Sequence, residues 1–249
     1  MTTMTILIVL FSLVLSFVFA LGGVGSAVAL IPVLTWLGVP FIQARPVGLF
    51  VNTVSMMGAT FSNIKAKRLD FRLGIPIILS SLILAPVGAW AGHLIPSRYV
   101  LMAFIAFLLF SGWMMLFFRG ARYVHQYRED RPILGPLLVG CAAGFVSGLL
   151  GVGGGGLISP LMILQGFHPK KVATITAFAV PFSSFSAFVT YAALGSVSIK
   201  ILLFAGLAAW AGGYLGTVVM HHRMRPDMVK KFLGLVLFLL ALRLILKVF

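Results

Sequence analysis

Long apolar stretches separated by short polar turns dominate the chain. Eight stand out, in two sets of four: 4–37, 46–64, 73–95 and 99–118, then 133–165, 172–194, 197–220 and 232–248. Most have about the 20 residues that a helix needs to cross the roughly 30 Å hydrocarbon core of a bilayer. The pattern predicts an all-α polytopic membrane protein whose main partner is the lipid bilayer.

The first stretch of each set is too long for one straight span. Stretch 4–37 contains 34 residues, which as a single helix would reach about 51 Å. Both long stretches are interrupted near the middle by glycines and then by a proline, residue types that end or break helices. Each is therefore either one kinked span or a hairpin of two half-helices that returns to its starting side.

The two sets repeat one pattern. A Gly-Val-Gly run followed by a proline and a glycine occurs twice at a constant offset: Gly23-Val24-Gly25, Pro32 and Gly38, then Gly151-Val152-Gly153, Pro160 and Gly166. Internal repeats of this kind are common in membrane transporters. We expect a first transmembrane repeat over 1–118, a basic cytoplasmic linker over 119–131 and a second transmembrane repeat over 132–249.

The basic residues discriminate between kinked spans and hairpins. If every stretch crosses once, the 19 Lys and Arg residues divide eleven to eight between the two sides. If both first stretches are hairpins, fourteen gather on one side against five on the other. Because cytoplasmic loops are enriched in Lys and Arg, the second count favours hairpins. Each half then crosses three times, so the two halves are inverted relative to each other.

Composition excludes several classes of protein. With 61% hydrophobic and 9% charged residues and a mean hydropathy of +1.12, the chain is too apolar for a soluble enzyme or a disordered regulator. The net charge of +15 comes from short basic turns without interleaved aromatics, so we expect no nucleic-acid partner. The pairs Gly88 and Gly92, and Gly212 and Gly216, have the spacing of helix-packing faces. Packing within one chain is expected there, with a homodimer interface as the alternative.

The glycine runs and the residues behind them form a characteristic order. The second half has Gly151-Val152-Gly153-Gly154-Gly155-Gly156, Pro160, Gly166, Ala173 and Thr176, and the first half has Gly22-Gly23-Val24-Gly25, Pro32, Gly38, Ala44 and Asp70-Phe71. Over nearly the whole chain this order resembles the sulfite exporter TauE/SafE family of membrane transporters. The first half departs from the family pattern at Ser26-Ala27, Arg45-Pro46 and Val47-Gly48. The resemblance implies transport of small sulfur-containing anions such as sulfite or organosulfonates.

A central site is expected where the two glycine runs meet. In lipid, irregular backbone is tolerated only where it is buried in protein or lines a wet cavity, and matching interruptions in two halves mark transporter sites. Amides at the positive end of a half-helix suit a compact oxyanion. The candidate substrate-binding residues are Gly22, Gly23, Gly25, Ser26, Asn52, Ser55, Gly153, Gly154, Gly155, Gly156, Thr176, Ser183 and Ser184. The alternative role of these residues is helix packing and helix-to-helix hydrogen bonding.

Ionisable residues are scarce inside the apolar stretches. The acids Asp70, Glu129, Asp130 and Asp227 all fall in expected loops, so coupling through a buried carboxylate is not expected. We expect no enzyme activity, no metal and no cofactor. Arg45 could attract an anion to the outer mouth, or it could anchor a helix at the interface. The sequence predicts a secondary transporter of small anionic substrates in the cell membrane, with an anion-selective channel of the same architecture as the alternative.

Overall fold

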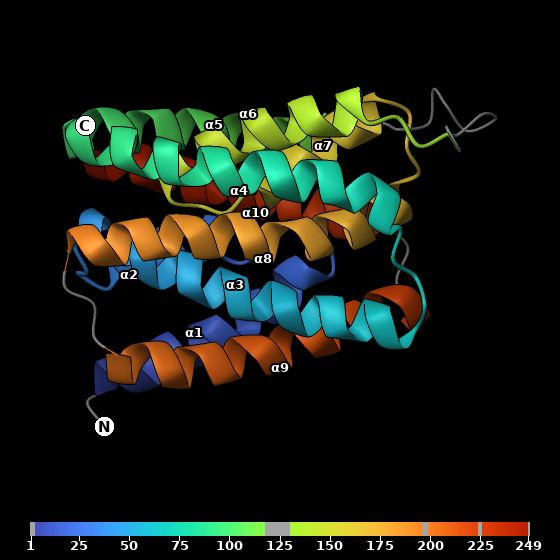
Figure 1. Cartoon of the computed structure of the whole chain (residues 1–249). Coiled ribbons are helices and arrows are strands. Elements are labelled where there is room, and N and C mark those ends of the chain that lie inside the picture. Colours follow the sequence, from blue (N-terminus) through green and yellow to red (C-terminus); the bar gives the residue numbers. More distant parts are fainter. Residues whose placement is uncertain (1–2, 118–129, 196–198, 224–225, 249) are drawn as a thin grey trace.

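The computed structural model describes residues 3–117, 130–195, 199–223 and 226–248, and every element in these ranges is a helix. The helices lie side by side in one bundle (Figure 1). They are α1 (Thr3–Ala20), α2 (Ala27–Trp36), α3 (Phe41–Lys65), α4 (Phe71–Leu94), α5 (Ser97–Phe117), α6 (Leu134–Leu150), α7 (Gly155–Leu164), α8 (Pro169–Leu194), α9 (Ile199–Arg223) and α10 (Pro226–Val248). Of the expected linker over 119–131, all but the last two residues lie outside the described residues.

Each overlong apolar stretch contains two helices. The chain leaves helical geometry at 21–26, between α1 and α2, and at 151–154, between α6 and α7; we call these segments break 1 and break 2. Four glycines in the breaks have positive φ: Gly23 (+65°), Gly25 (+91°), Gly151 (+77°) and Gly153 (+76°). Other residues rarely adopt such values, so these glycines redirect the chain from one helix into the next. The nearby prolines, Pro32 and Pro160, lie inside α2 and α7.

Helix α3 begins at Phe41, earlier than the apolar stretch that starts at 46. Pro46 therefore lies inside the helix, where it removes one backbone hydrogen bond but keeps a φ that a helix accepts. The earlier start places Arg45 on the helix itself.

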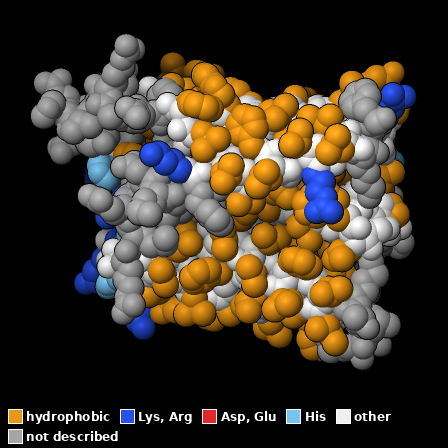
Figure 2. Space-filling model, turned by 180° about the vertical axis from the view of Figure 1, so that it is seen from behind, with side chains coloured by type: hydrophobic (Ala, Val, Ile, Leu, Met, Phe, Trp, Pro, Cys, Tyr) orange, Lys and Arg blue, Asp and Glu red, His pale blue; other side chains and the backbone are white. Residues whose placement is uncertain are grey.

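The surface of the molecule is suited to lipid. Figure 2 shows a broad face covered by hydrophobic side chains, with most of the coloured Lys, Arg and His side chains toward the left edge and others toward the right. Leu79, Ile83 and Trp90 of α4 and Leu207 of α9 are among the exposed apolar residues. Among the described residues, α4, α5, α8 and the 202–222 part of α9 are long and apolar enough to cross a membrane. The chain is therefore an all-α membrane protein.

One end of the bundle collects basic turns. The turns between α3 and α4 and between α7 and α8 lie at the right-hand end in Figure 1, as do the end of α9 and the start of α10, while the start of α1 and the end of α10 lie at the left. A hollow of about 670 Å³ at the right-hand end is lined by basic side chains that include Lys67, Arg68, Arg131, Lys170 and Lys171. We call it the basic hollow.

The long helices pack in pairs that join the two halves of the chain. Helix α4 packs along α6, and α9 packs along α1. Helix α3 lies against both α8 and α9, while α8 also lies against α4, and α5 packs against α10. The pairing of α4 with α6 is equivalent to that of α9 with α1, and the pairing of α3 with α9 is equivalent to that of α8 with α4, when each helix is replaced by the helix five places along the chain. Helices from before and after the 119–131 segment therefore contribute to the same hydrophobic clusters.

Small residues bring several of these pairs into backbone contact. A Cβ at Gly88 of α4 would meet the carbonyl oxygen of Phe145 on α6, and a Cβ at Gly212 of α9 would meet that of Leu13 on α1. The glycines four residues further on make contacts of the same kind. Such close approach favours van der Waals packing in membranes. Both glycine pairs singled out in the sequence pack within this chain.

The contact between α4 and α6 can be tested at Gly148, whose Cβ would overlap the carbonyl oxygen of Ala85. We expect Gly148→Ala to push the two helices apart and to lower the free energy of unfolding by about 1–3 kcal/mol. The measurement is the midpoint of thermal unfolding in detergent. Gly195→Ala is the control, because Gly195 has an extended φ of −156° and its nearest neighbour would lie 3.8 Å from the new Cβ. Equal midpoints for the two variants would contradict this packing.

Candidate functional site

The two breaks lie against each other inside the bundle. At the start of α7, a Cβ on Gly155 would collide with the carbonyl oxygen of Val24 in break 1. The side chain of Asn52, from the middle of α3, lies between the breaks, with Oδ1 facing Gly25 and Nδ2 facing Gly153. A Cβ on either glycine would collide with this amide. The two glycines therefore leave the space that Asn52 fills.

Asn52 is hydrogen bonded on both sides. Its Oδ1 accepts a bond from the backbone N–H of Ala27 at the start of α2, with an N···O distance of 3.4 Å. Its Nδ2 donates to Oγ of Ser184 on α8 at 2.9 Å. Asn52 and Ser184 are both 0% exposed, and buried polar groups with such partners fix the elements that carry them. We call Asn52, Ser184, Gly25 and Gly153 the central cluster.

Gly154, Gly155 and Ser183 border the central cluster. Gly154 is the N-cap of α7, and a Cβ there would lie 3.6 Å from Oγ of Ser183. That hydroxyl donates to the carbonyl of Val180 on its own helix at 3.1 Å. Gly155 joins break 2 to break 1 through its contact with Val24. These three sequence-predicted residues therefore lie beside the central cluster.

Three of the predicted glycines have other neighbours. Gly23 packs against Ala173 on α8, and Gly156 packs against the ring of Phe107 on α5. Gly22 is partly exposed, and its N–H donates to the carbonyl of Phe19 within the turn. Their contacts are those of helix packing and turn formation.

Three of the predicted hydroxyl residues also lie outside the central cluster. Oγ of Ser26 accepts a hydrogen bond from Ser16 of α1 at 3.2 Å, and Thr176 shares one with Ser159 of α7 at 3.2 Å. Ser55 is buried, its hydroxyl has no hydrogen-bond partner among the described residues, and its backbone lies against α9. The hydrogen bonds of Ser26 and Thr176 therefore join neighbouring helices, which is the alternative role expected for these residues.

The starts of α2 and α7 supply backbone amides beside the central cluster. Neither N-cap residue, Ser26 or Gly154, makes a side-chain capping hydrogen bond of its own, and the amide of Ala27 is bonded by Asn52 instead. The first amides of a helix lack intrahelical partners and lie at the positive end of the helix dipole. Within the described part of the chain, no group of three or more His, Cys, Asp or Glu residues is placed to hold a metal ion. The donors that gather here, amides and hydroxyls, suit a compact oxyanion.

Arg45 lies in the interior rather than at an interface or an exposed mouth, which corrects both sequence-based roles. Its side chain is 2% exposed. Its guanidinium donates to Oη of Tyr191 on α8 at 2.9 Å and to the carbonyl of Leu149 at 3.1 Å. The sequence contains a pattern that predicts this burial. Arg45 precedes Asn52 by seven residues, and residues two helical turns apart lie on the same face of a helix.

Comparison with known proteins places the chain in a family. A family model described as "Sulfite exporter TauE/SafE" matches residues 8–244, almost the whole chain. The chain belongs to the TauE/SafE family.

TauE/SafE relatives include proteins of matching length. "Probable membrane transporter protein YunE" of Bacillus subtilis is 25% identical over 96% of this chain and 97% of its own length. "Probable membrane transporter protein MJ0441" of Methanocaldococcus jannaschii is 23% identical over 95% and 93%. "Sulfite exporter TauE/SafE family protein 6" of Arabidopsis thaliana is 29% identical over 48% of this chain and 28% of that protein. No solved structure matches the chain. The relatives' names point to transport rather than catalysis.

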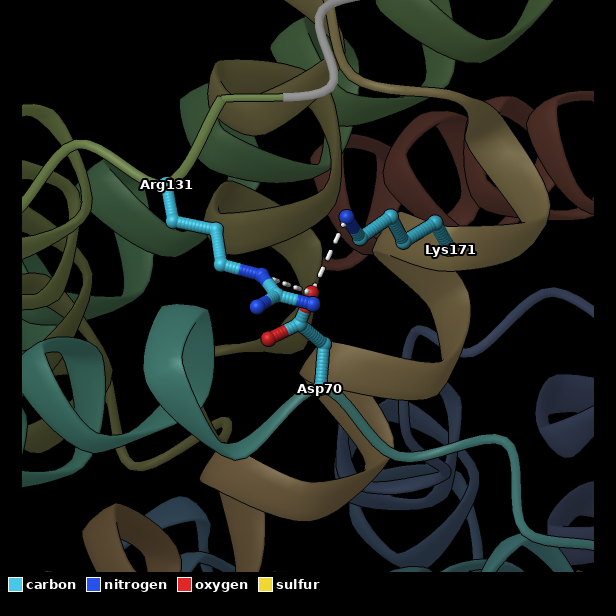
Figure 3. A network of polar contacts seen from close by, with 3 residues as sticks. All are labelled: Asp70, Arg131 and Lys171. Carbon is cyan, nitrogen blue, oxygen red and sulfur yellow. Dashed lines mark hydrogen bonds and ion pairs between the residues drawn. The ribbon is translucent and has the colours of Figure 1, made fainter.

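In this TauE/SafE protein, Asp70 links three segments at the basic end of the bundle (Figure 3). Its Oδ2 accepts a hydrogen bond from Nε of Arg131 at 3.2 Å and lies 3.0 Å from Nζ of Lys171. Burial opposes ionisation of Asp70, but the hydrogen bond and charge of Lys171, with those of Arg131, outweigh it and lower the pKa. The network joins the start of α4 to the start of α8 and to the segment before α6.

This network predicts a pH-dependent contribution to stability. The pKa of Asp70 is lower in the folded protein, so its contribution is present at neutral pH and is lost as the pH falls through the folded-state pKa. We expect Asp70→Asn to lower the free energy of unfolding at pH 7 by about 1 kcal/mol or less, as for other surface ion pairs. Lys171→Gln should cause a similar loss, and the double variant little more. The measurement is thermal unfolding from neutral to acidic pH. A difference from the wild type that is constant with pH would contradict this role.

Proposed function

We propose that this protein is a secondary transporter that moves small anions of the sulfite or organosulfonate class across the cell membrane. Its membership of the TauE/SafE family and the names of its full-length relatives support the transporter role. The observation that carries the site is the meeting of two helix breaks on the side chain of Asn52. Interrupted helices that meet inside a transporter are where substrates of such proteins bind.

The chemistry of the central cluster supports an anionic substrate. Nδ2 of Asn52, the hydroxyls of Ser183 and Ser184, and the first amides of α2 and α7 are hydrogen-bond donors without a full charge. Such donors can replace part of the hydration shell of an oxyanion without bringing a fixed charge into lipid. The family description adds the sulfur-containing class.

The proposed topology has a hairpin at the start of each half and an inverted relation between the halves. The gathering of basic turns at one end of the bundle, with both termini at the other, supports it. The matched pairings of α4 with α6 and of α9 with α1 support the repeat. By the positive-inside rule, the basic end then faces the cytoplasm in a multi-pass protein of the cell membrane.

The burial of the central cluster favours a carrier over a channel. A permanent pore would leave the groups on its path accessible to water, whereas Asn52 and Ser184 are 0% exposed. The basic hollow lies at one end of the proposed path, beside Lys170 and Thr174 at the start of α8. This arrangement suits alternating access, in which the site opens to one side at a time.

Counterflow in proteoliposomes tests the proposed function. Vesicles loaded with unlabelled sulfite receive labelled sulfite, sulfate or a small sulfonate outside. We expect saturable accumulation of labelled sulfite or of the sulfonate, because exchange through one occluded site couples the two fluxes. Unitary currents in a planar bilayer would instead indicate a channel. Folded protein that accumulates none of the three labels would contradict an anion carrier of this class.

Substitutions at the breaks test the site. Gly153→Ala and Gly155→Ala place a Cβ against Asn52 and against the carbonyl of Val24, and the first also strains a positive φ. We expect each to lower the counterflow rate at least about tenfold, the effect of a barrier raised by roughly 1.4 kcal/mol. Gly154→Ala should have a smaller effect, since its Cβ would meet the flexible end of Ile158 at 3.2 Å. Gly195→Ala is the matched control, and wild-type rates for all three break variants would exclude binding between the breaks.

A further inference from the structure

The guanidinium of Arg45 has hydrogen-bond partners but keeps an unused donor. Besides Tyr191 and Leu149, it approaches the carbonyl of Gly92 on α4 at 3.4 and 3.5 Å. It also lies over the ring of Tyr191, 4.5 Å from the ring centre. Its Nε is buried and has no hydrogen-bond partner. A buried guanidinium with a free donor is unusual, because buried polar groups are nearly always paired.

The charge of Arg45 has no carboxylate to balance it within the described residues. Asp70 is paired with Arg131 and Lys171 beyond the other end of α3; the distance along the helix from Arg45 to Lys65 is about 30 Å. The carbonyls of Gly92 and Leu149, near the ends of α4 and α6, offer partial charges only. A buried charge without a counterion is costly inside a membrane protein, and where it occurs it marks a functional site.

Arg45 and Tyr191 continue the central cluster along one interface. Arg45 pairs with Tyr191, and Asn52 pairs with Ser184, each at 2.9 Å between α3 and α8. The two pairs are seven residues apart on both helices, about 10 Å along the axis. Break 2 runs beside both, because Gly151 contacts the aliphatic part of Arg45 and Gly153 contacts Asn52.

Helix packing alone does not require an arginine at this position. At the constant offset that relates the two halves in sequence, the counterpart of Arg45 is Ala173. Ala173 packs against Gly23 in break 1 as Arg45 packs against Gly151 in break 2. The same contact is therefore made once by an alanine and once by an arginine. This contact with a break glycine therefore does not account for the charge of Arg45.

We infer that Arg45 and Tyr191 form a second binding site for a compact oxyanion, next to the central cluster on the side away from the basic hollow. The site rests on the proposed transport of anions and deepens it. The planar guanidinium can turn Nε and one terminal nitrogen toward two oxygens of the anion in exchange for the carbonyls of Gly92 and Leu149. Oη of Tyr191, which now donates to the carbonyl of Gly148 at 2.8 Å, supplies a further donor. An anion leaving the central cluster thus meets a positive charge at the next position along α3.

Equilibrium binding of radiolabelled sulfite to the purified full chain in detergent tests this site. We expect the wild type to bind sulfite at two sites and Arg45→Gln to weaken binding at one of them at least about tenfold. The variant should also reduce the rise in thermal midpoint that sulfite causes, because it removes the full charge of the second site. Arg45→Lys keeps a charge but loses the planar fork, so a loss of about threefold or more is expected. Arg98→Gln, at an exposed position near the start of α5, should bind as the wild type does.

Stability measured without anion separates binding from a structural role. If Arg45→Gln has a near-wild-type midpoint and unchanged sulfite affinity, the inference is overturned while the transporter proposal stands. If Arg45→Gln does not fold, Arg45→Lys decides: weaker binding by folded protein supports the site, and wild-type affinity overturns it. Absence of both sulfite binding and counterflow in the wild type would instead remove the proposed function, and this inference with it.

Discussion

The amide of Asn52 is the contact on which the interior of this protein depends. Where two helices end inside a bundle in lipid, no bulk water is present to satisfy their amides, so protein groups must do so. Asn52 accepts from the start of α2 through Oδ1 and donates to Ser184 through Nδ2. It can do both because glycines on either side leave the volume that its side chain occupies. An apolar residue of the same size would fill the space but leave the amide of Ala27 without this partner.

This constraint ties the two halves of the chain together. The breaks come from α1–α2 and α6–α7, and the side chains between them come from α3 and α8. Helices α1 and α6 are in turn packed along α9 and α4, through contacts at Gly212 and Gly88 that leave no room for a Cβ. Backbone packed so closely does not deform gradually. An anion that separates the breaks, as the proposed function requires, would therefore have to move these helices as rigid groups.

The sequence was sufficient to predict where the apolar helices and their breaks lie, but not which side of each helix contacts which neighbour. Hydropathy located the apolar stretches, and glycine clusters located the breaks because few other residues tolerate positive φ. The start of α3 was missed because Pro46 is typical of a first helical turn. Thr176 was grouped with Ser184 by residue type, although about 12 Å of helix separates them. In helices that are apolar all round, periodicity does not tell which hydroxyl points to which neighbour. Only the packing of α8 against α3 and α7 resolves that question.

The glycines of the two breaks occupy equivalent positions in the two halves of the chain, whereas the polar residues beside them do not. Glycines with positive φ occur at matching positions in both breaks. At the same offset, however, Asn52 corresponds to Val180, Ser184 to Met56 and Arg45 to Ala173. In a carrier built from two repeats, equivalent motions of the repeats open the binding site first to one side of the membrane and then to the other. The substrate, by contrast, needs one set of donors that stays the same whichever side is open. In the proposed repeat, residues that occur in one half only are therefore the positions at which substrate recognition should be sought, and Arg45 carries the only full charge among these three.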